Sequence, residues 1–300
     1  MPKQKRRNRF DDDDLTFEKL HTEETHWEET SDTPETGDRW STWDLSTPTE
    51  KGPLPHPDWL VTELAAVDIE HGVLKTGKEA DACLITRGVP GTDRACLMVA
   101  KRYRDDEHKM FHRDAGYLEG RRVRASRVNR AMANRSDFGR EAIAGQWAVA
   151  EFGALCRLWE ICGQLGVEPF VPYPVQILGT EVLMEFIGEP DGTAAPRLAT
   201  VRGDLAEIKD LWEQLFLALR VMARAGYTHG DLSPYNILVH GGRLVVIDLP
   251  QIVDVVANPQ GKRFVQRDVH NVVTWFAARG LSDLDETKIV AELVAEAGIR

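Results

Sequence analysis

The chain has 300 residues, 42% of them hydrophobic, so it is long enough for one large domain or two modest ones. Its formal net charge of -11 argues against a protein that coats nucleic acid with its whole surface. No apolar run approaches the roughly 20 residues that cross a bilayer, and the basic N-terminus leads into acids rather than a signal segment. The four cysteines form no disulfide framework, and we interpret them as small buried apolar residues. We therefore expect a cytoplasmic protein with no membrane partner.

Residues 1–58 differ sharply in composition from the rest of the chain. Residues 11–50 hold fourteen acids, two basic residues and almost no aliphatic residues, so they bury too little surface to offset chain entropy. We predict a disordered acidic tail over 1–58. Half of the eight tryptophans lie in or beside it: Trp27, Trp40, Trp43 and Trp59. They predict either a docking motif for a protein or ribonucleoprotein partner, or a segment that folds back on the domain surface.

The pattern becomes globular from Trp59. Residues 72–103 alternate apolar and β-branched runs with turns, which predicts a small antiparallel sheet. Residues 109–140 then carry nine Lys and Arg against three acids, with little apolar periodicity. They predict a basic loop, which is either a solvated linker or a contact for phosphate on a ligand or an RNA partner.

The rest of the chain predicts helices and strands in alternation. Apolar residues recur at helical spacing in several segments, and glycines mark the ends of these segments. The predicted elements are helices over 141–166, 204–226, 267–280 and 286–298, with strands within 169–190 and 241–249.

Two segments, HGDLSPYN and LVVIDLPQ, carry the candidate catalytic and metal-binding residues. Asp231, Asn236 and Asp248 supply a carboxylate for an acceptor hydroxyl and oxygen ligands for Mg²⁺, which metal-assisted phosphoryl transfer needs. A cation must also hold the phosphates. Lys101, at the end of the strand CLMVAK, is the candidate, and Glu151 on the following helix is placed to orient it by an ion pair.

These residues resemble the RIO family of atypical serine/threonine protein kinases, most closely its RIO1 branch. The resemblance implies a protein-kinase-like, two-lobed α+β fold, with a β-rich N-lobe over about 59–187 and a truncated helical C-lobe over about 188–300. The matching segments run in family order: TGKEA, VAKRY, WAVAEFGAL, LMEFIG, HGDLSPYN, VIDLPQ and RDVHNVVTWF.

The resemblance also implies roles for individual residues at an ATP and Mg²⁺ site. Asp231 is the implied catalytic aspartate, and Lys101 is the implied phosphate contact. Asn236 and Asp248 are the implied magnesium ligands, and in characterised members the aspartate at the position of Asp248 also accepts phosphate. The other implied nucleotide contacts are Lys78 in TGKEA, Glu151, Ser233, and the hinge residues Glu185 and Ile187.

Three further expectations concern the surroundings of this site. Leu183, Met184 and Leu238 are expected to line an adenine pocket. His229 is expected to support the loop by packing and hydrogen bonds rather than to act as an acid or base. Ser233 either contacts phosphate or stabilises the turn before Pro234.

Three functional classes remain open. The first is a serine/threonine kinase that phosphorylates itself and an unknown protein acceptor, with Ser126 and Ser136 as candidate sites. The second is an ATPase switch, in which hydrolysis times release from an assembly such as a maturing small ribosomal subunit. The third is a small-molecule phosphotransferase of the aminoglycoside or choline kinase type. Against the third class, the residues after Asp248 are LPQIV rather than a run with a second acid.

Two features narrow the kinase reading. Only 52 residues follow Asp248, and the next helix is expected by about Arg267, so we expect no activation segment with a peptide-binding subdomain. The lysine, the catalytic aspartate, the asparagine and the metal aspartate are all present, which argues against a pseudokinase scaffold.

Overall fold

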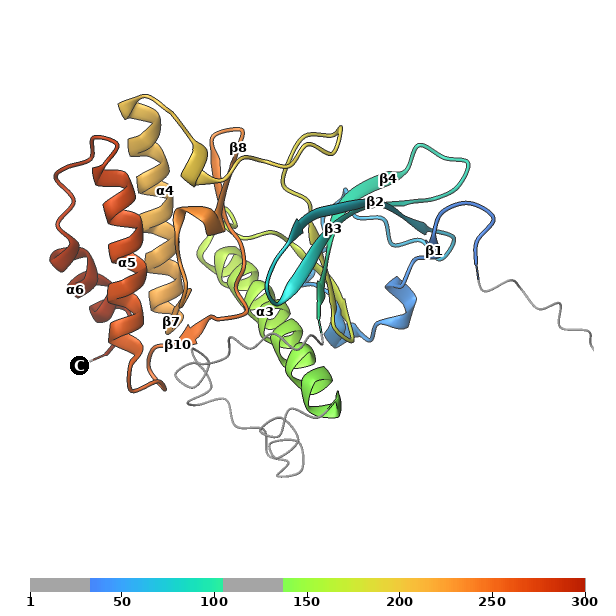
Figure 1. Cartoon of the computed structure of the whole chain (residues 1–300), viewed down its shortest axis with the longest axis horizontal. Helices are drawn as coiled ribbons and strands as arrows, with labels where there is room; N and C mark the ends of the chain where they lie inside the picture. The colour runs from blue at the N-terminus through green and yellow to red at the C-terminus, as the bar shows by residue number, and fades with distance from the viewer. Residues whose placement is uncertain (1–32, 105–136, 300) are drawn as a thin grey trace, which may run out of the picture. The chain divides into compact units, whose positions relative to one another are not determined.

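The computed structural model describes residues 33–104 and 137–299, and Thr33–Arg300 form one compact unit. One part of it, on the right in Figure 1, is a six-stranded antiparallel sheet with the strand order β1-β2-β3-β4-β6-β5. The sheet confirms the prediction made from residues 72–103. The strands are β1 Arg39–Trp40, β2 Val67–Thr76, β3 Ala80–Gly88, β4 Ala95–Tyr103, β5 Pro174–Leu178 and β6 Glu181–Glu185.

The prediction of disorder over 1–58 is wrong for residues 33–58, which fold as a segment that we call the N-terminal strap. In the strap, β1 pairs with β2 at the sheet edge, and two short 3-10 helices follow, η1 Trp43–Leu45 and η2 Pro48–Glu50. Trp43 is 6% exposed and belongs to the same apolar cluster as residues of the sheet, whereas Trp40 is 46% exposed. The strap orders because it adds to an existing sheet edge and core, so its own composition does not decide its state.

Four helices stand where the sequence places them. They are α3 Asp137–Leu165, α4 Leu205–Arg224, α5 Gly261–Ala277 and α6 Glu286–Glu296. α5 begins six residues before the predicted start at Arg267, because Phe264 and Val265 extend its buried face toward the N-terminus. Residues 137–140, predicted as part of the basic loop, belong to α3. In Figure 1, α4, α5 and α6 lie together, and α3 runs between them and the sheet.

Two short ladders connect these layers and carry the HGDLSPYN segment. β7 Tyr227–Thr228 pairs with β10 Val253–Asp254, and β8 Ile237–His240 pairs with β9 Arg243–Val246. The segment therefore begins at the end of β7 and ends at the start of β8. A 3-10 turn, η5 Pro234–Asn236, completes it.

Some expectations fall outside the described residues. These are the tail before residue 33 with Trp27, and the part of the basic loop that holds Ser126 and Ser136. Among the helices that the structure describes, none combines the length and the apolar character of a membrane span. The four cysteines are free. Cys83, Cys96 and Cys162 are buried, as predicted, whereas Cys156 is only partly buried.

Candidate active site

The centre of the site is a buried ion pair between the sheet and α3. Lys101 Nζ on β4 lies 2.6 Å from Glu151 Oε1, and the Glu151 side chain is only 1% exposed. Burial alone would lower the pKa of Lys101, but the adjacent carboxylates of Glu151 and Asp248 outweigh it and raise that pKa. Lys101 is therefore held as a cation at the end of its strand. The pair expected from the sequence does form in the fold.

Glu151 is held by two further donors that sequence reasoning did not identify. The hydroxyl of Tyr103 donates to Glu151 Oε2 at 2.6 Å, and the Leu249 amide donates to Oε1 at 3.2 Å. Burial, together with the charge of Glu151, raises the pKa of Tyr103, which keeps the hydroxyl a donor. Tyr103 lies two residues after Lys101, so the alternation of the strand was the signal that could have found it.

Asp248 follows β9 and is the second carboxylate that contacts Lys101. Lys101 Nζ lies 2.7 Å from Asp248 Oδ1, and the Asp248 side chain is 42% exposed. Its backbone adopts φ 70, a left-handed conformation that residues other than glycine adopt at a cost and that clusters at functional sites. Burial raises the pKa of Asp248, but the charge and hydrogen bond of Lys101 outweigh it and leave that pKa below its usual range. One carboxylate oxygen faces Lys101 while the side chain stays open to the cleft.

The HGD turn is anchored by Asp268 on α5, a residue that the sequence analysis quoted in RDVHNVVTWF without giving it a role. Asp268 is fully buried and accepts three hydrogen bonds. Thr228 Oγ1 and Gly230 N donate to Oδ2, each at 2.7 Å, and Leu232 N donates to Oδ1 at 3.0 Å. A buried acid on an otherwise apolar helix face was the signal for this role.

Glycine at position 230 is required by the same turn. It has φ +86, and a Cβ there would stand 2.3 Å from the carbonyl oxygen of Gln251. The loop after Asp248 therefore passes directly against the HGD turn. His229 supports this arrangement as expected, because its Nε2 bonds to Ile247 O at 3.0 Å and its Nδ1 accepts from Asp231 N at 3.3 Å. Together these two bonds require the proton on Nε2.

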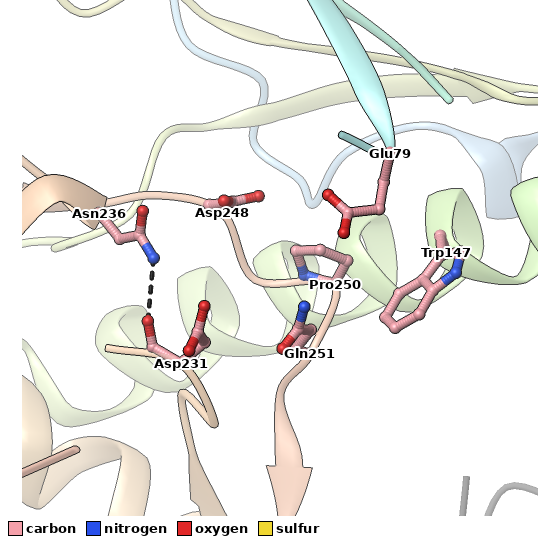
Figure 2. Close-up of a pocket in the computed structure, with 7 residues that line it drawn as sticks. All are labelled: Glu79, Trp147, Asp231, Asn236, Asp248, Pro250 and Gln251. Carbon is pink, nitrogen blue, oxygen red and sulfur yellow. Dashed lines mark hydrogen bonds between the residues drawn. The ribbon is translucent and has the colours of Figure 1, made fainter. Parts of the chain in front are cut away.

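Asn236 and Asp231 face the cleft from this loop (Figure 2). The Asn236 amide nitrogen donates to the backbone oxygen of Asp231 at 2.9 Å, which turns the amide oxygen away from that contact and leaves it as the available acceptor. The Asp231 side chain is 52% exposed, and one of its oxygens lies 3.8 Å from Arg267. Sequence reasoning did not single out Arg267.

The cleft has a wall that the sequence did not predict. Besides Asp231, Asn236 and Asp248, it is lined by residues of the β2–β3 turn, α3 and the segment after Asp248 (Figure 2). These additional lining residues are Glu79, Trp147, Pro250 and Gln251.

Lys78, the predicted nucleotide contact in TGKEA, has a second lysine near it on β2. Lys78 is exposed in the turn between β2 and β3 and is not among the residues that line the cleft. Lys75, on β2, lies within the electrostatic field of the site. Burial and the charge of Arg197 lower its pKa, Lys101 lowers it further, and Asp248 opposes them. Lys75 pairs with Ala82, which pairs with Lys101, so Lys75 lies on the Lys101 face of the sheet, and the sequence did not reveal this register.

One prediction about the hinge region is wrong, namely that Leu183 lines an adenine pocket. Lys101 pairs with Val182, and Ala100 pairs with Leu183, so Leu183 points to the opposite face of the sheet from Lys101. Leu183 packs with the cluster of Trp43 instead of lining an adenine pocket. Met184 lies on the Lys101 face of the sheet, and its contact with adenine stays a prediction.

Three other residues were predicted to lie near a bound nucleotide: Ile187, Leu238 and Ser233. Ile187 packs with Ala195 and Val245, and Leu238 packs against them. Ser233 makes no side-chain capping bond to the 3-10 turn that follows it, so its proposed turn-stabilising role finds no such bond in this fold.

A strand lysine paired with a helix glutamate, above a loop with aspartate and asparagine and a second aspartate after a strand, defines a protein-kinase-like site. Comparison with known proteins agrees with this class. The family model described as a RIO domain matches residues 99–289. The chain therefore belongs to the RIO family.

Individual relatives support the same assignment. The chain is 32% identical to the RIO-type serine/threonine-protein kinase Rio1 of Haloferax volcanii over 233 residues, which are 77% of this chain and 71% of that protein. It is 30% identical to the serine/threonine-protein kinase RIO1 of Saccharomyces cerevisiae over 50% of this chain and 30% of that protein. It is 34% identical to the mouse serine/threonine-protein kinase RIO3 over 47% of this chain and 26% of that protein. The matches thus span most of the archaeal relative but less than a third of the eukaryotic ones.

Proposed function

We propose that this chain transfers the γ-phosphoryl group of ATP to a serine or threonine hydroxyl, with Mg²⁺ as cofactor, and that it phosphorylates itself as well as an unknown protein acceptor. The observation that supports this most is that Asp231, Asn236 and Asp248 line one cleft, and that Lys101 lies 2.7 Å from the Asp248 carboxylate. No single segment supplies these groups. Three segments, β4, HGDLSPYN and the residues after β9, bring together a phosphate cation, two oxygen ligands and an acceptor-side carboxylate.

Lys101 is the proposed phosphate contact. Its cation is oriented by Glu151, which is itself fixed by Tyr103, so the ammonium group is positioned before nucleotide arrives. The hinge backbone at Glu185 and Ile187 is the proposed contact for the adenine edge, with Met184 and Leu238 beside it. Ser233 and Lys78 remain proposed phosphate contacts, and Lys75, which lies on the Lys101 face of the sheet, is a further candidate.

The donor set of the cleft fits Mg²⁺. Asn236 and Asp248 present one amide oxygen and one carboxylate, and Mg²⁺ is commonly held by a few protein oxygens together with nucleotide phosphates and water. The bound ion would neutralise charge on the phosphates. Asp248 would have to share its carboxylate between the ion and Lys101, and its 42% exposed side chain leaves room for this.

Asp231 is the proposed acceptor-side residue. Its carboxylate accepts the proton of the acceptor hydroxyl while that oxygen bonds to the γ-phosphorus and the bond to the β-phosphate oxygen breaks, releasing ADP. Its side chain is open to the cleft, and Asn236 holds its backbone carbonyl. Arg267 beside it would limit the directions that the carboxylate can take.

An ATPase switch is the second candidate function, and the position of Asp248 favours it. Its carboxylate is half-exposed and stands in the cleft where a γ-phosphate would lie, so it has access to act as the phosphate acceptor. Transfer to Asp248 followed by hydrolysis would return the enzyme and release phosphate. A ribonucleoprotein partner bound through the acidic tail or the basic loop 109–140 is part of this proposal, as is a cytoplasmic location.

A single-turnover assay with γ-labelled ATP and Mg²⁺ distinguishes the two functions. Acid-stable label on serine or threonine would support the kinase. Label that hydroxylamine removes, lost when Asp248 is replaced by asparagine, would support the switch. Neither label nor phosphate release, from protein that is folded by circular dichroism, would contradict both.

A further inference from the structure

Tyr173 contacts both the N-terminal strap and the hinge at Glu185, which are far apart in the sequence. It lies directly before β5, and its side chain is fully buried. Its ring packs edge-on against Trp159 at 5.0 Å and Trp59 at 6.2 Å between ring centroids. A buried tyrosine needs a partner for its hydroxyl, and this one finds it in the N-terminal strap.

The backbone of Tyr173 holds the hinge. Its amide donates to Glu185 Oε2 at 2.9 Å, and the Glu185 amide donates back to the Tyr173 carbonyl at 2.9 Å. Glu185 is the last residue of β6, from which the chain continues to Ile187 and the lower lobe. The two reciprocal bonds fix both the side chain and the backbone of the hinge residue.

The side chain of Tyr173 holds the strap. Its hydroxyl donates to the Pro53 carbonyl at 2.8 Å and lies 2.8 Å from His56 Nδ1. Because the hydroxyl has one proton and gives it to Pro53, His56 must donate from Nδ1. Burial and the nearby charge of Lys51 lower the pKa of His56, which favours the neutral ring.

The approach of the strap at this point is close enough to require glycine. A Cβ at Gly52 would stand 1.8 Å from the Pro174 carbonyl oxygen, and the Gly52 amide donates to the Val175 carbonyl at 2.9 Å. The strap is therefore seated on the β5 backbone on one side of Tyr173 while Pro53 and His56 hold the hydroxyl. This seating leaves Tyr173 little freedom to move relative to the strap.

We propose that Tyr173 is a positioning residue for nucleotide binding, through which the N-terminal strap holds the hinge in the geometry that accepts adenine. The proposal rests on the function proposed above, because it takes the hinge at Glu185 to contact ATP. The bonds of Tyr173 join the strap to the hinge at Glu185, so the contribution that we propose concerns nucleotide affinity and not the transfer step. Pre-ordering of the hinge strengthens binding because less order has to be imposed when ATP arrives.

Two variants test the link. In Tyr173→Phe the ring packing stays and the bonds to the strap are lost. In His56→Ala one of those bonds is lost. We expect the KM and the dissociation constant for ATP to rise about fivefold in Tyr173→Phe and about two- to threefold in His56→Ala, with kcat within about twofold of the parent. His56→Asn, which keeps a donor near the position of Nδ1, should restore most of the affinity.

Glu50→Gln is the matched control, because it weakens the strap without touching Tyr173. Glu50 accepts from the Thr47 amide at 2.8 Å in an exposed capping box. The control should keep the parental KM. Equal KM in Tyr173→Phe and Glu50→Gln, with Tyr173→Phe lowering only the melting temperature, would show that Tyr173 is merely structural. If the parent protein itself fails to bind ATP, the proposed function fails; if the parent binds and the variants bind equally well, only this inference fails.

Discussion

The two faces of the upper sheet are built by opposite means. On the cleft face, Lys101 is held by a buried carboxylate from α3, Glu151, and by a half-exposed one after β9, Asp248. On the other face, Trp43 of the strap packs in the same closed apolar cluster as Tyr173. One face of the sheet therefore holds groups of the candidate active site, and the other face holds a packed cluster that stabilises the fold.

This contrast sets how substitutions should behave. A change on the cleft face removes a charge or a hydrogen bond from a site that stays accessible to water, so it should alter activity more than folding. A change under the strap opens a cavity in a packed cluster, so it should alter folding more than the transfer step. Variants that violate this division would break the comparison.

The largest effect on activity is expected from Asp231→Ala. We expect phosphoryl transfer to fall by about 10² to 10⁴, the usual contribution of a general base, with ATP affinity within about twofold of the parent. The unfolding free energy should hardly change, because the Asp231 side chain is 52% exposed. Single-turnover transfer and equilibrium ATP binding measure the two quantities. Asp248→Ala is the contrasting variant and should weaken Mg²⁺-dependent ATP binding itself; equal loss of affinity in both variants would contradict this division of roles.

The largest effect on stability is expected from Trp43→Ala under the strap. Trp43 is 6% exposed, packs edge-on against His56 with ring centroids 5.1 Å apart, and carries Lys51 Nζ 4.5 Å above its ring. Removal of the ring should lower the unfolding free energy by about 3 to 5 kcal/mol. Urea unfolding followed by circular dichroism measures it.

Trp40→Ala is the control for this change, because Trp40 lies in the same strap but is 46% exposed. It should cost below about 1 kcal/mol. If both variants lose the same stability, the strap contributes through its presence at the sheet edge and not through the buried ring of Trp43.

Asp268→Ala should show an effect of middle size on both properties. The change leaves the amides of Gly230 and Leu232 without their buried acceptor, and it should cost about 2 to 3 kcal/mol of stability. Transfer should fall more than ATP affinity does, because the turn that carries Asp231 loosens. Asp254→Ala is the control, since its carboxylate also accepts two backbone amides but at an exposed turn. Parental transfer in Asp268→Ala would show that the turn holds its geometry by other contacts.

The catalytic motifs and most elements could be predicted from the sequence because their causes are local. HGDLSPYN needs its glycine, aspartate and asparagine in fixed order, and α4 shows its apolar stripe and its Asp204 capping box within one segment. The pair of Lys101 and Glu151 was also within reach, since each residue sits in a segment with a clear pattern.

The parts that were missed depend on contacts between distant segments. Composition predicts disorder for residues 33–58. In the fold, however, the side-chain amide of Gln176, 130 or more positions further along the chain, donates to the hydroxyl oxygens of Thr42 and Ser46 in a buried hydrogen-bond network. The face on which Leu183 lies depends on strand register, which a short apolar run does not reveal. Asp268 was visible as an acid in an apolar helix, but its partners lie on a turn that only the fold brings near.

The smallest expected effect sharpens the comparison most, because it concerns a group that is buried and still belongs to the cleft face. Tyr103→Phe removes the hydroxyl that donates to Glu151 Oε2, while Lys101 and the Leu249 amide still hold Oε1. We expect a loss of about 1 to 2 kcal/mol in unfolding free energy, and a fewfold weaker ATP affinity because Glu151 orients Lys101 less firmly. Chemical unfolding and equilibrium ATP binding measure the two changes.

Tyr227→Phe is the matched change at a more accessible hydroxyl, which bonds to Arg157 on the surface, and it should alter neither quantity by much. If the Tyr103 variant loses stability but binds ATP as the parent does, Tyr103 contributes to stability alone, as the strap residue Trp43 is expected to do. Residues that matter for ATP binding would then be separated from residues that matter only for stability at the 2.6 Å hydrogen bond between Glu151 and Tyr103. The two faces of the sheet would not mark that division.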